Sequence, residues 1–202
     1  TVPASLPQSA PRLNMGRDTS LLGCLPLFHS FGCTVTLWYP VIEGVNLVTY
    51  PSPLETKRLA ELISLQQIDV LLATPTFLRG YMKRIDPAQL ESLKLIVTGA
   101  EKLPQTLADA FEEKFGIRPM EGYGLTETSP ATNVNLPDPA EESGAHAIPA
   151  QLGGSVGQLL PGIAIRLVDA VTDKPVPLDQ PGIIILKGPN IFPGYLRDEN
   201  RT

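Results

Sequence analysis

Residues 93–121 read LKLIVTGAEKLPQTLADAFEEKFGIRPME, and this stretch decides the fold class. Leu93–Thr98 is a short apolar run, which predicts a buried strand. Leu103–Phe115 predicts a helix that Gly116 closes, because glycine is typical of the position after a helix. Ile117–Glu121 is short and ends before a glycine, so it favours a second strand over a helix.

The same alternation extends towards the amino terminus. Leu47–Tyr50 and Asp69–Ala73 are predicted strands, and Leu54–Gln67 and Phe77–Ile85 are predicted helices. Strands that alternate with helices imply parallel crossovers, so the fold class predicted is α/β, with a layered sheet of parallel β-α-β units.

Three loops are expected at one edge of this sheet. They contain Thr74–Thr76, Gly99 and the glycines that follow Glu121, and each comes directly after a predicted strand. Ligands of open α/β sheets bind outside the carboxyl ends of the strands. We therefore expect the three loops to wall a single pocket.

The stretch from Thr19 to Ile42 contains no charged residue and is long enough to cross a bilayer. Prolines, glycines and hydroxyl residues interrupt it, which argues against a spanning helix. We interpret Leu22–Leu27 as a buried strand, followed by a loop and a second buried element at Thr34–Ile42. Residues 1–20 lack the apolar core of a signal peptide.

The character of the chain changes after Asn135. Residues 136–152 are rich in proline, glycine, serine and acidic residues and predict an exposed linker. Residues 153–202 read as short strands separated by Pro/Gly turns, an all-β piece. The predicted organisation is thus an N-terminal extension (1–20), an α/β subdomain (21–135), the linker and the β piece.

Composition limits the possible functions. The net charge is −5 and the pI about 5.1, and the basic residues are scattered, which argues against nucleic acid as a partner. Cys24 and Cys33 form no CxxC pair, and two histidines accompany them, so neither zinc nor a disulfide framework is indicated. Two buried thiols in a reducing cytoplasm are the expectation.

The most informative motif runs from Met120 to Pro130 and reads MEGYGLTETSP. Its glycines permit close backbone approach, which leaves the Tyr123 ring free as a stacking face. The Thr126 hydroxyl is suited to a phosphate oxygen, and the Glu127 carboxylate to Mg²⁺. Each residue alone has an ordinary alternative, namely a core ring, a helix cap and a surface charge. Together they favour a nucleotide and its metal.

This motif resembles the signature of the acyl-adenylate-forming (AMP-binding) superfamily, which includes acyl-CoA synthetases, luciferases and adenylation domains. Residues 98–103 (TGAEKL) resemble its adenine-binding turn, and residues 25–32 (LPLFHSFG) its motif beside the acyl site. The resemblance extends from Leu22 to Arg197 and is greatest to bacterial acyl-ACP synthetase / 2-acylglycerophosphoethanolamine acyltransferase enzymes. It implies a small β-barrel subdomain in residues 153–202, and a helix at Thr34–Ile42, where β propensity alone predicts a strand.

The resemblance also implies roles for individual residues. Tyr123 would stack on adenine, Thr126 would contact the α-phosphate, Glu127 would hold Mg²⁺, and His29 would shape the entrance to the acyl channel. The residues expected to border the nucleotide are Gly99, Ala100, Glu101, Gly122 and Gly124. The reaction implied is attack of a carboxylate on the α-phosphate of ATP to give acyl-AMP, then transfer of the acyl group to a thiol of CoA or an acyl carrier protein.

The family's phosphate loop, ribose-binding aspartate and catalytic lysine are not found, so the chain is interpreted as an internal piece of a longer enzyme, inactive alone. Amino-acid-activating relatives carry Phe-Asp where this chain has Phe28-His29. An ammonium would lack its partner here, which favours a fatty or other hydrophobic acid. The apolar lining expected for this acid is Gly32, Thr34, Val35, Leu37 and Trp38, with ordinary core packing as the alternative for these residues.

Alternatives stay open at this point. They are a nucleotide-binding fragment without activity, a stable α/β fragment that binds nothing until joined to the rest of the enzyme, and an adenylation domain for another carboxylic acid. The expected location is cytoplasmic. A location at the inner face of the membrane, with peripheral contact through regions outside this chain, stays open.

Overall fold

The computed structural model describes residues 15–136 and 151–202. Its main element is a seven-stranded sheet with the order β2-β1-β3-β4-β5-β6-β7. The first five strands in this order are parallel, and β6 and β7 are antiparallel. The strands are β1 (Ser20–Gly23), β2 (Asn46–Thr49), β3 (Val70–Ala73), β4 (Leu95–Thr98), β5 (Met120–Tyr123), β6 (Asn133–Val134) and β7 (Gln158–Leu159). The predicted layered α/β fold with parallel crossovers is confirmed.

The helices begin and end near the predicted residues. They are α2 (Ser30–Cys33), the π-helical η1 (Thr34–Trp38), α3 (Tyr39–Glu43), α4 (Thr56–Gln66), α5 (Pro75–Arg84), η2 (Pro87–Leu90), α6 (Gln105–Phe115) and η3 (Thr126–Thr128). Thr74 caps α5 by accepting from the Phe77 amide, and Pro75 occupies its first turn. Gly116 ends α6 with φ of 72°.

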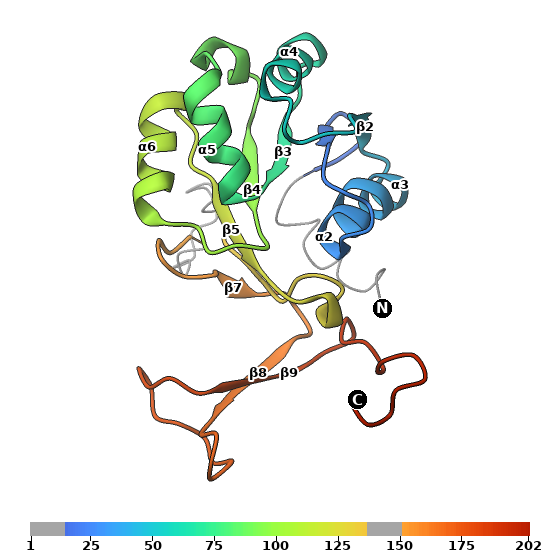
Figure 1. Ribbon diagram of the computed structural model, residues 1–202, viewed down its shortest axis with the longest axis vertical. Helices are drawn as coiled ribbons and strands as arrows, with labels where there is room; N and C mark the ends of the chain where they lie inside the picture. Colours follow the sequence, from blue (N-terminus) through green and yellow to red (C-terminus); the bar gives the residue numbers. More distant parts are fainter. Residues whose placement is uncertain (1–14, 137–150) are drawn as a thin grey trace, which may run out of the picture.

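Helices cover the two faces of the sheet unequally. The helices α4, α5 and α6 pack on one face, and the α2–η1–α3 helix lies on the other (Figure 1). Successive side chains of β3 point to opposite faces of the sheet. Leu71 and Ala73 belong to the core beneath α4, α5 and α6. Val70 and Leu72 belong to the core on the opposite face.

The α2–η1–α3 helix is continuous from Ser30 to Glu43. The family resemblance therefore predicts residues 34–42 correctly, and β propensity does not. The helix buries Thr34, Thr36 and Tyr39 against the sheet, so tertiary packing outweighs the low helix propensity of its β-branched residues.

The predicted strand at Leu22–Leu27 is wrong in its extent, because β1 ends at Gly23. The chain then turns, with the His29 amide donating to the Pro26 carbonyl at 3.2 Å. That carbonyl lies so close to Gly32 that a Cβ there would be 2.2 Å from it. Leu27 is 53% exposed as a result.

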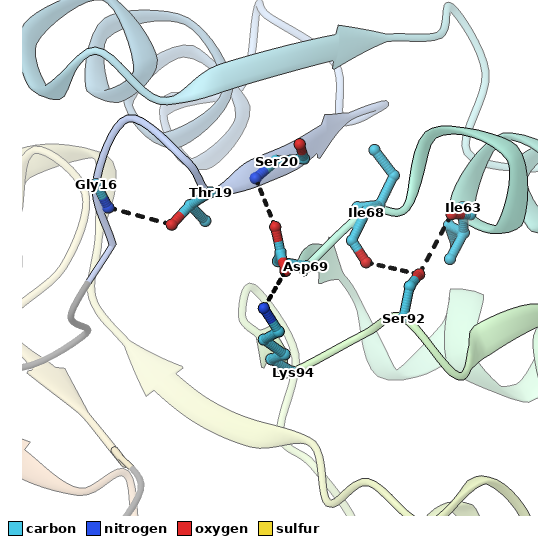
Figure 2. A network of polar contacts seen from close by, with 8 residues as sticks. All are labelled: Gly16, Thr19, Ser20, Ile63, Ile68, Asp69, Ser92 and Lys94. Atoms are coloured by element: carbon cyan, nitrogen blue, oxygen red, sulfur yellow. Dashed lines mark hydrogen bonds and ion pairs between the residues drawn. The ribbon is translucent and has the colours of Figure 1, made fainter.

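A polar network joins the amino ends of β1, β3 and β4 (Figure 2). The Asp69 carboxylate accepts from the Ser20 amide at 2.8 Å and pairs with the Lys94 ammonium at 2.7 Å. Burial raises the pKa of the Asp69 carboxyl, but the hydrogen bonds from Lys94 and Ser20 and the charge of Lys94 outweigh it, so the net pKa is lowered. The network fixes the relative position of three strands.

Residues 151–202 contribute to two sheets. β7 completes the main sheet, whereas β8 (Ala164–Val168) and β9 (Ile183–Lys187) pair antiparallel and project away from it (Figure 1). The resemblance implies a small β-barrel here, and the part of it that the described residues form is this two-stranded sheet. Residues 1–14 and 137–150, and with them most of the predicted extension and linker, lie outside the described residues. The division into domains stays a prediction.

Two further expectations concern membranes and cysteines. Within residues 15–136 and 151–202, no helix is long and apolar enough to cross a membrane. Cys24 is buried and Cys33 half-buried, and both are free thiols. Burial raises the pKa of the Cys24 thiol to about 12.

Candidate functional site

A cavity of about 310 Å³ lies at the carboxyl ends of β4 and β5, between the α2–η1–α3 helix and the sheet. Its two kinds of lining differ in chemistry. Apolar side chains of the sheet and the helix line one part: Leu21, Val35, Val70, Leu72, Leu95 and Val97. Glycines, hydroxyls and rings line the other: His29, Ser30, Phe31, Gly99, Ala100, Gly122, Tyr123, Gly124 and Thr126.

The turn after β4 meets the helix closely. A Cβ on Gly99 would lie 3.3 Å from the Phe31 ring, so a glycine lets the two approach. Ala100 follows with φ of 66°, in the left-handed region. Gly99 and Ala100 thus line the cavity as expected. Phe31 lines it too, and sequence reasoning missed its part because nothing local connects it with Gly99.

Glu101 is exposed and contacts the neighbouring loop. Its Oε2 accepts from the Thr76 hydroxyl at 2.7 Å. The expectation that three loops wall one pocket is therefore wrong for Thr74–Thr76, which does not line the cavity. This loop begins α5 immediately, through the Thr74 cap and Pro75. Glu101, which is expected to border the nucleotide, bonds to this loop and is not among the residues that line the cavity.

The glycines of the Met120–Pro130 motif act differently from one another. A Cβ on Gly124 would lie 1.9 Å from the Pro130 carbonyl oxygen, so the loop closes only over a glycine. A Cβ on Gly122 would have its nearest neighbour at 3.6 Å, an ordinary contact. Neither glycine has positive φ, so the expected unusual dihedrals are not present, and close approach requires a glycine at Gly124 but not at Gly122. Tyr123, the last residue of β5, lines the cavity between them.

Two of the sequence motifs meet at one hydroxyl pair. Ser30 Oγ and Thr126 Oγ1 are 3.3 Å apart, although 96 residues separate them. His29 lies beside them, exposed, and its Nδ1 accepts from the Phe31 amide at 3.2 Å to cap α2. His29 and Thr126 both line the cavity as expected. The cap also gives His29 the structural role that is the ordinary alternative for a lone histidine.

Glu127 follows Thr126 on η3, just outside the cavity lining. Its Oε1 accepts from the Tyr195 hydroxyl at 2.5 Å. This hydrogen bond, together with a backbone one, lowers the pKa of the Glu127 carboxyl, which is therefore ionised at neutral pH. Sequence reasoning missed Tyr195, because a contact across 68 residues leaves no local signal.

The donor set fits magnesium bound with a nucleotide. The candidate ligand is the Glu127 carboxylate, a hard oxygen donor, and the Ser30 and Thr126 hydroxyls are suited to the phosphate oxygens. Residues 15–136 and 151–202 contain no cluster of three or more His, Cys, Asp or Glu side chains suited to a metal. One carboxylate is sufficient when phosphate oxygens and waters complete the shell, as is usual for Mg²⁺.

The expected acid-binding face of the helix is half right. Thr34 and Val35 line the cavity. Gly32 is buried against the Pro26 turn, and Leu37 and Trp38, which are 37% and 46% exposed, are not among the residues that line the cavity. The apolar part of the cavity comes mainly from β3 and β4, a contribution that the residue pattern of the helix did not indicate.

Known proteins resemble this chain both in sequence and in fold. A probable 4-coumarate–CoA ligase from Dictyostelium discoideum is 31% identical over 190 residues, which are 92% of this chain and 32% of that protein. The crystal structure of apo MatB from Rhodopseudomonas palustris has a TM-score of 0.83 at 25% identity, covering 96% of this chain and 36% of that one.

A second solved structure contains both expected ligands. The O-succinylbenzoate coenzyme A synthetase MenE from Bacillus subtilis, in complex with ATP and magnesium ion, has a TM-score of 0.81 at 26% identity, covering 97% of this chain and 38% of that one. The chain thus spans about a third of the length of its curated relatives. The AMP-binding enzyme family matches residues 4–196. The chain belongs to the AMP-binding enzyme family.

Proposed function

We propose that the full-length protein uses ATP to activate a hydrophobic carboxylic acid as acyl-AMP and then transfers the acyl group to a thiol. The observation that carries this proposal is the cavity itself. One cavity is lined both by glycines and hydroxyls, among them Thr126 next to Glu127 in the chain, and by aliphatic side chains such as Val35 and Val97. A ligand with an anionic head and an apolar body suits such a space.

The polar part suits the nucleotide. Gly99 and Ala100 give an edge with little side-chain bulk beside the Tyr123 ring, where a flat base can stack. The Thr126 hydroxyl is available to a phosphate oxygen, and the Ser30 hydroxyl next to it supplies a second polar contact. Mg²⁺, when bound with the phosphates by Glu127, would neutralise their charge.

The apolar part suits the acid. Among the described residues that line the cavity, none is Asp or Glu, so a substrate ammonium would be buried without a partner. The side chains of β3 and β4 instead offer aliphatic surface to a hydrocarbon chain or ring. This argument favours fatty and aromatic acids over amino acids.

The reaction needs alignment more than a reactive side chain. A carboxylate oxygen of the acid attacks the α-phosphorus, the bond from that phosphorus to the bridging oxygen breaks, and pyrophosphate leaves. The chain's own residues hold the two reactants in line and place hydroxyl donors where charge accumulates. CoA is the proposed acceptor, since the Dictyostelium relative and MenE are both named for coenzyme A; an acyl carrier protein is the alternative.

ATP–pyrophosphate exchange by the full-length protein tests the proposal. Long-chain, short-chain and aromatic acids and amino acids are offered with Mg²⁺. Exchange is expected with hydrophobic acids and its loss in Glu127→Gln. Exchange with amino acids alone would contradict the acid assignment. Mg-ATP binding without exchange for any acid would favour a nucleotide-binding protein without this activity.

A further inference from the structure

The chain segment after β9 returns to the motif that carries Glu127 (Figure 1). Asn190 is fully buried, and its side-chain amide donates to the Thr128 carbonyl at 2.6 Å and to the Ala131 carbonyl at 2.8 Å. The Phe192 amide donates to the Glu127 carbonyl at 2.9 Å. Three backbone carbonyls of residues 127–131 are therefore held by this segment.

Tyr195 makes a different kind of contact in the same segment. Its hydroxyl touches the side chain of Glu127, not the backbone. The ring packs edge-on against Phe192, with centroids 4.8 Å apart and an interplanar angle of 78°. The ring contact fixes the direction of the hydroxyl, and the hydroxyl fixes one carboxylate oxygen.

A half-buried glutamate on a three-residue helix otherwise has several rotamers, and selecting one for a metal costs conformational entropy. The Tyr195 bond occupies Oε1 and leaves Oε2 to a cation. Groups that orient a metal ligand in this way affect metal affinity although they do not touch the metal.

We propose that Tyr195 is a positioning residue that orients Glu127 for Mg²⁺, which makes the segment after β9 part of the nucleotide site. This inference rests on the proposed function, because it takes Glu127 as the magnesium ligand. The segment after β9 then has two separate functions. Asn190 and Phe192 hold the backbone, and the Tyr195 hydroxyl sets the carboxylate.

Tyr195→Phe in the full-length protein is the test, because it removes the hydroxyl and keeps the ring against Phe192. Calorimetric titration measures ATP binding at a series of Mg²⁺ concentrations and in EDTA. The Mg²⁺ concentration for half-maximal enhancement of binding is expected to rise roughly tenfold, the lower end for loss of such a partner. Binding in EDTA and the melting temperature are expected to match the wild type.

The chain offers a matched control in Tyr50, whose hydroxyl donates to Glu55 Oε2 at 2.6 Å away from the site. Tyr50→Phe removes the same kind of hydrogen bond and is expected to leave the Mg²⁺ dependence unchanged. In exchange assays the activity of Tyr195→Phe is expected to return to the wild-type kcat when the Mg²⁺ concentration is high.

Other outcomes overturn the inference. An unchanged or lowered Mg²⁺ requirement in Tyr195→Phe, while the wild type still binds Mg-ATP, would overturn it and leave the proposed function intact. Weaker binding in EDTA together with a lower melting temperature would make Tyr195 structural only. Wild-type protein that binds no Mg-ATP would overturn both. Glu127→Gln that binds Mg-ATP as the wild type does would overturn the inference and the magnesium assignment.

Discussion

The two faces of the main sheet are made by the same strands but differ in how completely they are filled. The face under α4, α5 and α6 is closed by fully buried side chains such as Leu71, Ile96 and Phe111. On the opposite face, the α2–η1–α3 helix is the helix that the described residues supply, and this face contains the cavity, which Leu72 and Val97 line. One face supplies stability, and the other leaves room for a ligand.

Replacing neighbouring leucines of β3 gives the largest expected contrast. Leu71→Ala creates a void in a closed core, and about 3 kcal/mol of unfolding free energy should be lost. Leu72→Ala enlarges a cavity that already exists, so the loss should be about 1 kcal/mol smaller. Urea unfolding of the full-length variants measures both. Equal losses would show that the cavity face is as tightly packed as the other.

Enlarging neighbouring residues of β4 sharpens the same contrast. Ile96→Phe overfills the closed face, at an expected cost of about 2 kcal/mol. Val97→Phe extends into the cavity, and its cost should be below about 1 kcal/mol. In exchange assays Val97→Phe should shift the preference towards shorter acids, and Ile96→Phe should not. A reversed order of stabilities would contradict the assignment of the two faces.

The Asp69 network at the amino ends of β1, β3 and β4 belongs to neither face, and its removal gives the smallest expected loss of stability. The lowered pKa of Asp69 means that its contribution is present above the pKa of the unfolded chain, about 3.9, and is lost as pH falls through the lower folded value. Asp69→Asn should therefore cost about 1 kcal/mol at pH 7 and progressively less below pH 4. Unfolding at several pH values measures it; a constant difference would remove the ionic explanation.

Local patterns were sufficient for most of this architecture. The strands at Leu47–Tyr50 and Leu93–Thr98 and the helix closed by Gly116 were predicted within a few residues, because each is bounded by a turn residue. The helix at Thr34–Ile42 was not predictable from propensity, since its β-branched residues favour a strand and burial against the sheet decides otherwise.

The site was predictable only in part for a related reason. Gly99, Tyr123 and Thr126 belong to contiguous motifs, and the structure brings them to one cavity. Phe31 against Gly99 and Tyr195 on Glu127 are contacts between distant segments, which depend on the complete topology. Thr74–Thr76 shows the converse: a correct sheet edge does not ensure that a loop reaches the pocket.

A crystal structure of the full-length protein with a hydrolysis-resistant acyl-adenylate analogue tests the central claim most directly. We predict that the adenine lies between Gly99–Ala100 and Tyr123, and that the acyl chain lies against the apolar lining that includes Val35 and Val97. An analogue bound with its acyl chain away from β3 and β4, or with its adenine elsewhere, would contradict the account.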